Sequence, residues 1–457
     1  MVPQGEQSIA TGFRLGRPLN GRRSIGSEPS RLSLRQNFLW SLVGNVSYAA
    51  CQWGVLVCLA KLGSPEIVGR FGLALAVTGP VILLSQLQLR DVFVTDSKRK
   101  FGFGEYLSLR LILTAAAVAA IAGLAWAGGY AAETMLVVLA VGLGKAAESI
   151  ADVFYACFQR HERMDRIARA LMLQGALSLA AVGTVMALLG SVGWSAVGWA
   201  AAAGVILGLY TLPSARRLAR EEGRLSEATE TSNGDKGTRP RGEVRRLAEL
   251  AWFALPLGVV MMLISLQVNI PRCYLDGYRG EAELGIYTAL AHLTASGNMV
   301  MQALGQSAIP RLARHYAAGD GGAFRRLLLR LLGIGLVAGM TGLLLVAVAG
   351  APLLRLLYTE EYAGNVGTLG LLAAAAAIGY LAAFLGDAMT VFRVFRTQLL
   401  LSALVTAVMA ASCWLWVPRY GMRGAAWALI VTAAVRLIAG GMVVVLAQRN
   451  LRGRQTA

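Results

Sequence analysis

Long apolar runs recur along the whole chain and are separated by short polar segments. Each run has about 20 residues or more, which is enough for a helix to cross a hydrocarbon layer of ~30 Å. The runs are continuous and lack the period-2 alternation that is typical of barrel strands. The pattern predicts an all-α polytopic membrane protein with about twelve transmembrane helices. The predicted spans are residues 37–62, 68–90, 104–128, 132–158, 167–190, 193–213, 247–272, 283–309, 327–350, 365–391, 397–417 and 421–447.

A polar segment in the middle of the chain divides these spans into six and six. Residues 214–246 carry many charges, with Gly, Ser and Thr, and few large apolar side chains, which favours a solvated cytoplasmic linker. The first 36 residues are polar with six Arg, unlike a cleaved signal peptide. The predicted organisation is a cytoplasmic polar tail (1–36), an N-lobe of six spans (37–213), the linker (214–246), a C-lobe of six spans (247–447) and a cytoplasmic tail (448–457).

The two halves show a faint internal similarity. At a separation of 216 residues, Gly69 corresponds to Gly285 and Phe71 to Tyr287, in segments that open the second span of each half. Six spans in each half with the same orientation favour two parallel repeats related by an axis along the membrane normal. Transporters with that arrangement rock one half against the other around a central site.

The charge distribution sets the expected orientation. The chain has 43 Lys and Arg against 25 Asp and Glu, for a net charge of +18. If the N-terminus is inside, most of the Lys and Arg fall on the cytoplasmic side, which predicts a multi-pass protein of the plasma membrane with both termini cytoplasmic. A basic surface that faces the anionic lipid bilayer accounts for this charge, so nucleic acid is not an expected partner.

The sequence lacks the motifs of common enzymes. It contains no GxxxxGK[ST], HExxH, CxxC or GxSxG pattern, and its five Cys have no metal-ligand spacing. The predicted outer loops are short and leave little room for an extracytoplasmic catalytic domain. We therefore expect a protein that is not an enzyme and that needs no metal or cofactor.

Four segments carry a resemblance to a known family. They are GKAAESIADVFYACFQRHERMDRIA, ALPLGVVMMLISLQVNIPRCYLDGYRGEAELGIYTALAHL, GNMVMQALGQSAIPRLARHYAAGD and VPRYGMRGAAWA. In this order and spacing they resemble the Wzx-type polysaccharide (oligosaccharide) flippases, which belong to the multidrug/oligosaccharidyl-lipid/polysaccharide exporter superfamily. The resemblance extends over nearly the whole membrane region.

The resemblance implies a MATE-like fold of two six-helix lobes around a central cavity. It also implies transport of a polyprenyl-diphosphate-linked oligosaccharide from the inner to the outer leaflet of the bacterial plasma membrane, by alternating access. The surface polymer could be a lipopolysaccharide, a capsule or an exopolysaccharide. Glycosyltransferases and a polymerase of the same pathway are then possible partners, and an H⁺ or Na⁺ gradient is a possible driving force. The alternatives are a multidrug or cation antiporter of the same superfamily, a membrane polymerase or ligase, and a transport-inactive scaffold.

A stripe of charged and polar side chains follows one face of the fourth predicted span. At 100° per residue, Lys145, Glu148, Asp152 and Gln159 share a narrow sector of the helix. A lone charge at the centre of a span costs ~2.5–3.5 kcal/mol on insertion scales, so this face contacts protein or water. Two interpretations stay open. Either Lys145 pairs with Glu148 and Asp152 with an Arg to brace the lobe, or the stripe lines a cavity for the substrate or a coupling cation.

Two pairs of polar residues lie near predicted span ends. Arg90 ends the second span and Arg110 begins the third, where each could reach lipid headgroups or turn inward as an entry site for a diphosphate. Asn269 and Arg272 close the seventh span near the outer face and could receive the substrate before release. The adjacent Pro271 is a candidate end of that helix.

The C-lobe has further embedded polar residues. His292 and Gln302 in the eighth span are candidates for interhelical hydrogen bonds or for ligand binding. Asp387 and Arg436 could pair with each other. Alternatively, Arg436 contributes to a cavity for the anionic substrate, and Asp387 binds the H⁺ or Na⁺ that drives transport.

Overall fold

A computed structural model describes residues 33–96, 100–218, 240–392 and 395–455. Within these ranges the chain is helical and contains no strand. Most of the predicted N-terminal tail and central linker lies outside the described residues. The helices are α1 (Leu34–Leu62), α2 (Pro65–Gln86), α3 (Leu89–Thr95), α4 (Phe103–Ala127), α5 (Ala132–Arg160), α6 (Met164–Leu189), α7 (Val192–Ile206) with the π-helical η1 (Leu207–Thr211), α9 (Pro240–Arg279), α10 (Glu281–Ala317), α11 (Gly321–Leu357), α12 (Glu360–Ala363), α13 (Val366–Val391) and α14 (Phe395–Gln455).

Ten of the described helices are long and apolar enough to cross a membrane, and the predicted count of twelve stays a prediction. The difference arises at two places. The helix α10 is long, but its polar residues make it less apolar than the other long helices, and α14 is one continuous element where two spans are predicted. Inside α14, Gly421 has a φ of 55° and a ψ of −131°, so the helix direction changes there. The Glu283 carboxylate accepts a hydrogen bond from the Met422 N–H at 2.5 Å on the far side of this change.

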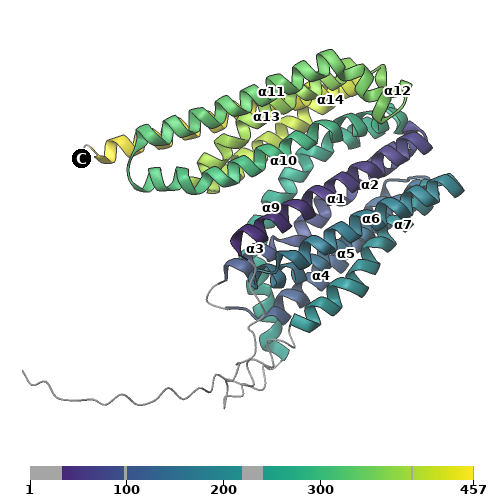
Figure 1. Cartoon of the computed structure of the whole chain (residues 1–457), viewed down its shortest axis with the longest axis horizontal. Helices are drawn as coiled ribbons and strands as arrows, with labels where there is room; N and C mark the ends of the chain where they lie inside the picture. Colours follow the sequence, from purple (N-terminus) through teal and green to yellow (C-terminus); the bar gives the residue numbers. More distant parts are fainter. Residues whose placement is uncertain (1–32, 97–99, 219–239, 393–394, 456–457) are drawn as a thin grey trace, which may run out of the picture.

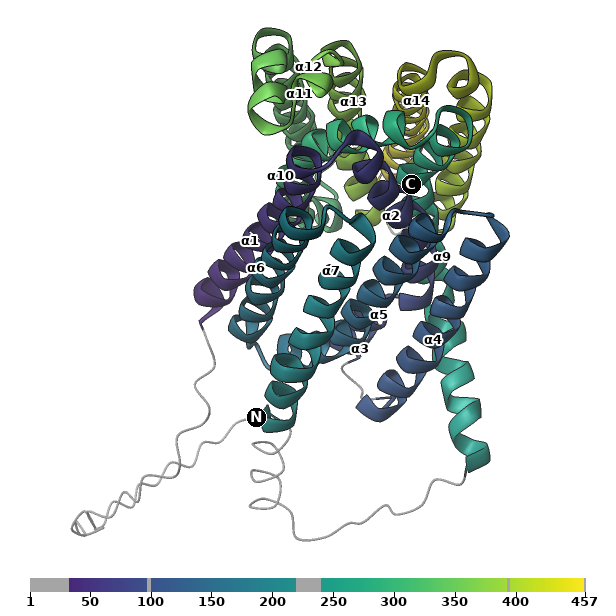
Figure 2. The same ribbon diagram turned by 90° about the vertical axis from the view of Figure 1, so that its right-hand side faces the viewer.

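The helices form two bundles (Figures 1 and 2). We call α1–α7 the N-lobe and α10–α14 the C-lobe. The bundles converge where α1 and α2 meet α10 and α12, and they diverge toward the C-terminus (Figure 1). The predicted topology places the convergent end on the outer side of the membrane. The fold class is therefore all-α and polytopic, as predicted.

The helix α9 is shared by the two bundles. Near its start, Lys100 and Glu249 form an ion pair of 2.7 Å, and Leu250 packs into the N-lobe cluster around Phe93. Farther along, the Gln267 amide donates hydrogen bonds to the Ser402 carbonyl at 3.2 Å and the Thr406 hydroxyl at 3.0 Å, both on α14. The predicted lobe boundary at residue 247 thus falls at the start of a helix that runs from one lobe into the other (Figure 2).

The prediction that Pro271 ends its helix is wrong. Pro271 lies inside α9, which continues to Arg279. A proline removes one backbone hydrogen bond, but neighbouring helices and side chains compensate for this loss in membrane helices. Arg272 therefore lies within a helix, and it is buried.

The two lobes meet most closely where α2 crosses α10. A Cβ on Gly285 would lie 1.8 Å from the Pro65 carbonyl oxygen, and one on Gly69 would lie 1.9 Å from the Glu281 carbonyl oxygen. Small residues let helix backbones approach in this way. Gly69 and Gly285 are the equivalent pair of the predicted repeat, so the two halves touch at corresponding positions.

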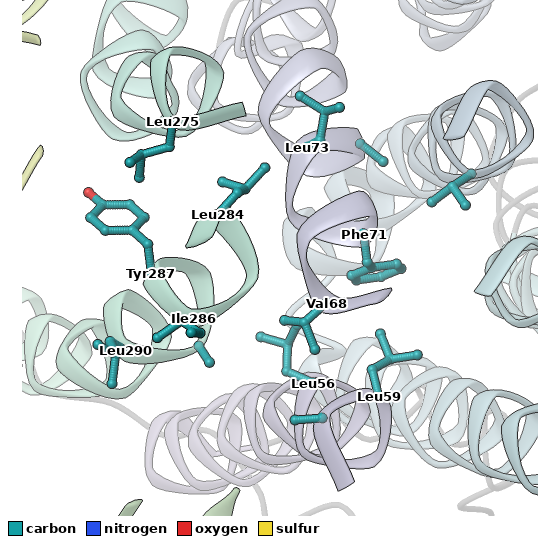
Figure 3. Close-up of a cluster of buried hydrophobic side chains, with 14 of the residues drawn as sticks. Leu56, Leu59, Val68, Phe71, Leu73, Leu275, Leu284, Ile286, Tyr287 and Leu290 are labelled. Carbon is teal, nitrogen blue, oxygen red and sulfur yellow. The ribbon is translucent and has the colours of Figure 1, made fainter. Parts of the chain in front are cut away.

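Apolar and charged contacts flank this crossing. Figure 3 shows the apolar part, where Leu56 of α1 and Val68 of α2 lie toward Ile286 of α10. At the polar edge, Arg70 pairs with Glu133 and, at 2.7 Å, with Glu281. The Thr134 hydroxyl donates a hydrogen bond to Glu281 at 3.0 Å. These contacts hold the lobes together at the end that is predicted to face outward.

We expect Gly285→Ala to destabilise the protein by about 1–3 kcal/mol, because its new methyl group would overlap backbone atoms of α2. The measurement is thermal unfolding of the purified protein in detergent. Gly123→Ala on α4 is the matched control, since its Cβ would meet no atom within 4 Å. That control should stabilise its helix by up to ~1 kcal/mol. Equal melting temperatures for the Gly285→Ala variant and the unchanged protein would contradict the close crossing.

Candidate functional site

The charged stripe of α5 is paired within the N-lobe. The Lys145 ammonium lies 2.8 Å from Glu148 Oε2. The other oxygen, Glu148 Oε1, accepts hydrogen bonds from the Tyr48 hydroxyl and the Gln174 amide, each at 2.7 Å. Lys145 Nζ also lies 5.2 Å from the centroid of the Trp199 ring. Glu148 therefore joins α5 to α1 and α6.

Asp152 holds two arginines, one from α3 and one from α4. Its Oδ1 lies 3.1 Å from Arg90 Nη1, and its Oδ2 lies 3.4 Å from Arg110 Nη2. Arg110 Nη1 donates a further hydrogen bond to the Ser149 hydroxyl at 3.1 Å, and Arg90 Nε donates one to Gln159 at 2.9 Å. The Arg110 side chain is 0% exposed, so it does not extend to lipid headgroups. These contacts agree with the interpretation in which Asp152 pairs with an Arg to brace the lobe.

A second group of basic residues lies in the C-lobe, where α9, α10, α13 and α14 surround a cavity of about 540 Å³. Four of the residues singled out in the sequence line it: Arg272, His292, Gln302 and Arg436. The lining also includes polar residues that sequence reasoning missed, among them Gln267, Asn298, Tyr380 and Thr432. Their signal is a polar residue inside an apolar run, which is visible for Gln267 in the segment LISLQVNIPR.

The cavity is basic and lacks a compensating carboxylate. None of its lining residues is Asp or Glu. Arg272 is 7% exposed, and its Nη1 donates a hydrogen bond to Asn269 Oδ1 at 2.9 Å. The buried Nε of Arg272 has no hydrogen-bond partner among the described residues. Neither Arg272 nor Arg436 has a carboxylate within 4 Å in the described ranges. A buried cation without a counterion is costly, and an anionic ligand would relieve that cost.

The basic residues of this cavity come from different helices. His292 on α10 and Arg272 on α9 line the cavity, whereas Lys145 on α5 does not. Lys145 is partly exposed, unlike the enclosed Arg110.

Of the six predicted site residues on α9, α10, α13 and α14, two do not line the cavity. Asn269 lies behind Arg272 and is buried. Asp387 is half-buried on α13 and packs against α10, where a Cβ on Gly305 would lie 2.1 Å from its Oδ2. Asp387 and Arg436 do not form an ion pair. Among the residues that the structure describes, no group of three His, Cys, Asp or Glu could hold a metal ion.

The chain is similar to a known protein family and to a characterised relative. The family model described as "Polysaccharide biosynthesis protein" matches residues 34–315. The capsular polysaccharide biosynthesis protein CapF of Staphylococcus aureus is 25% identical over 403 residues, covering 88% of this chain and 97% of the relative.

Two solved structures share the fold. An inward-facing MATE multidrug resistance transporter of the MOP superfamily superposes with a TM-score of 0.69 at 14% identity, covering 91% of this chain and 99% of that one. The lipid II flippase MurJ in an inward closed conformation gives a TM-score of 0.68 at 10% identity, covering 91% and 90%. The predicted MATE-like fold is confirmed. Because the family model matches more than half of the chain, and in agreement with its sequence motifs, the chain belongs to the polysaccharide biosynthesis protein family.

Proposed function

We propose that this membrane protein is a transporter that flips a polyprenyl-diphosphate-linked oligosaccharide from the inner to the outer leaflet of the bacterial plasma membrane. The observation that carries the proposal is the C-lobe cavity, where the buried Arg272 lies with His292 and Arg436 and no carboxylate. A diphosphate cannot cross hydrocarbon unpaired, and a guanidinium binds phosphate oxygens with two parallel hydrogen bonds. The polyprenyl chain can stay in the bilayer while the charged headgroup occupies the protein.

The N-lobe stripe fits the same proposal. If the Lys145 ammonium turns from Glu148 toward a phosphate, Glu148 Oε1 keeps its hydrogen bonds from Tyr48 and Gln174. Glu148 would thus remain partly satisfied without its cation. Arg90 and Arg110 stay bound to Asp152 in this scheme and act as a brace for the lobe.

Alternating access supplies the movement. The lobes are joined where α2 crosses α10, so the cavity would receive its substrate from the opposite, cytoplasmic side. Opening of this crossing would then release the substrate outward. An H⁺ or Na⁺ gradient is part of the proposal as driving force, with Asp387 as the candidate residue for the coupling ion.

The basic cavity distinguishes this proposal from its runner-up. A multidrug or cation antiporter needs carboxylates or aromatic faces directed at a cationic substrate, whereas the charged lining here is basic. In the proposed setting both termini are cytoplasmic. The glycosyltransferases and polymerase of the same pathway would act before and after the flipping step.

Depletion of the protein in its native host tests this role. We expect the lipid-linked precursor to accumulate on the cytoplasmic leaflet and the surface polysaccharide to disappear. Precursor accessibility to a membrane-impermeant reagent in spheroplasts measures the first effect. A plasmid copy with Arg423→Gln, an exposed arginine outside the cavity, should restore the polymer, whereas Arg272→Gln should not. Unchanged outer-leaflet precursor in a strain without a second flippase would contradict the proposal.

A further inference from the structure

Asn269 lies directly behind the buried guanidinium of the cavity. Its Oδ1 accepts a hydrogen bond from Arg272 Nη1 at 2.9 Å. Its Nδ2 donates to the Ser265 carbonyl at 3.0 Å and lies 3.2 Å from the Ser265 hydroxyl oxygen. Because the amide nitrogen is engaged with the preceding turn of α9, the amide oxygen must face the arginine. Asn269 therefore determines where the Nη1 group of the Arg272 guanidinium lies.

The other lobe holds this pair in place. Gly79 of α2 packs against it, and a Cβ at that position would lie 3.2 Å from Asn269 Nδ2 and 3.3 Å from the Ser265 hydroxyl oxygen. Asn269 is 7% exposed. The amide is thus enclosed between α9 and α2 and has little room to turn. Arg272 itself lines the cavity, whereas Asn269 does not.

The chemical nature of this partner distinguishes Arg272 from the arginines of the N-lobe. Arg90 and Arg110 are held by the carboxylate of Asp152, whose negative charge offsets part of theirs. Arg272 is held by a neutral amide of nearly the same shape as a carboxylate. An amide orients the guanidinium through one hydrogen bond and leaves its positive charge uncompensated.

We infer that Asn269 is a positioning residue, which orients the Arg272 guanidinium and, because it is neutral, keeps that charge available for the diphosphate of the substrate. The inference rests on the proposed function. It assigns to Asn269 a role through Arg272 rather than direct contact with the substrate. It also explains why an asparagine, and not an aspartate, suits this position.

The sharpest test compares Asn269→Asp with Asn269→Ala. The probe is farnesyl diphosphate, with farnesol as the uncharged control, bound to the purified full-length protein in detergent. Asn269→Asp should bind farnesyl diphosphate roughly 10- to 100-fold more weakly, because the new carboxylate pairs with Arg272. The same variant, without ligand, should melt at or above the temperature of the unchanged protein. A purely structural role would not produce this combination of equal or higher stability and weaker binding.

Asn269→Ala gives a second, independent readout. It removes the hydrogen bond but adds no charge, so binding should weaken by a smaller factor, roughly 3- to 10-fold. Asn269→Asp protein that folds and binds farnesyl diphosphate as tightly as the unchanged protein would overturn the inference. If Asn269→Asp does not fold, Asn269→Ala with unchanged affinity would overturn it as well.

Failure of the proposed function has a different result. In that case the unchanged protein would bind farnesyl diphosphate no more tightly than farnesol. A clear preference of the unchanged protein for farnesyl diphosphate, with no effect of either Asn269 variant, would reject only the positioning role.

Discussion

Asp152→Ala should destabilise the protein by about 3–5 kcal/mol, because it removes the carboxylate partner of the fully buried Arg110. Arg110 is 0% exposed and has Asp152 as its carboxylate partner at 3.4 Å. Without Asp152, the Arg110 guanidinium keeps one hydrogen bond, to the Ser149 hydroxyl at 3.1 Å. Its buried Nε has no partner in the described part of the chain even in the unchanged protein. Thermal unfolding in detergent, followed by size-exclusion chromatography, measures the effect.

The matched control removes both charges. In the double variant Arg110→Met with Asp152→Ala, the buried cation is gone, so much of the lost stability should return. If Asp152→Ala alone melts like the unchanged protein, the brace assigned to the α5 stripe is wrong. Loss of transport with full stability would instead indicate that Asp152 contacts the substrate.

Arg272→Gln should weaken binding of a polyprenyl diphosphate by roughly 10- to 100-fold, since hydrogen bonds to charged groups contribute about 1.5–3 kcal/mol. Glutamine keeps a polar side chain but lacks the positive charge. Arg272→Lys should lose less, because it retains the charge without the two-pronged geometry of the guanidinium. Equilibrium binding of a fluorescent polyprenyl diphosphate to protein in nanodiscs is the measurement.

The exposed arginine variant Arg423→Gln serves as the control for net charge. It should bind the probe like the unchanged protein. Equal affinity of Arg272→Gln and Arg423→Gln would remove Arg272 from the site. Because Arg272 is buried, each variant must first be shown to elute as folded monodisperse protein.

Much of the fold follows from the hydrophobic pattern. Long apolar runs can span the bilayer only as helices, since unpaired backbone groups are too costly there. The helical period also places Lys145, Glu148 and Asp152 on one face, as the structure has them. The internal repeat, faint in the sequence, places Gly69 opposite Gly285 at the lobe crossing.

The partners of these residues were harder to predict. Periodicity indicates which way a side chain points along its own helix, but the residue opposite depends on how distant helices pack. Tyr48 and Glu148 are 100 positions apart, and nothing local connects them. For the same reason the sequence left open whether Arg110 reaches the lipid headgroups or turns inward, and which Arg pairs with Asp152. Pro271 does not end its helix, although proline often does, because neighbouring helices compensate for the backbone hydrogen bond that proline lacks.

The most direct test of the central claim is translocation in proteoliposomes. The purified protein is reconstituted with a fluorescent polyprenyl-diphosphate-linked oligosaccharide, and a membrane-impermeant quencher reports the fraction of lipid in the outer leaflet over time. We expect the unchanged protein to make the inner-leaflet lipid accessible much faster than empty liposomes do. Arg272→Gln should lack this activity, and a polyprenyl-linked oligosaccharide without the diphosphate should not be moved. Translocation no faster than in empty liposomes, or equal movement of the lipid without a diphosphate, would contradict the account.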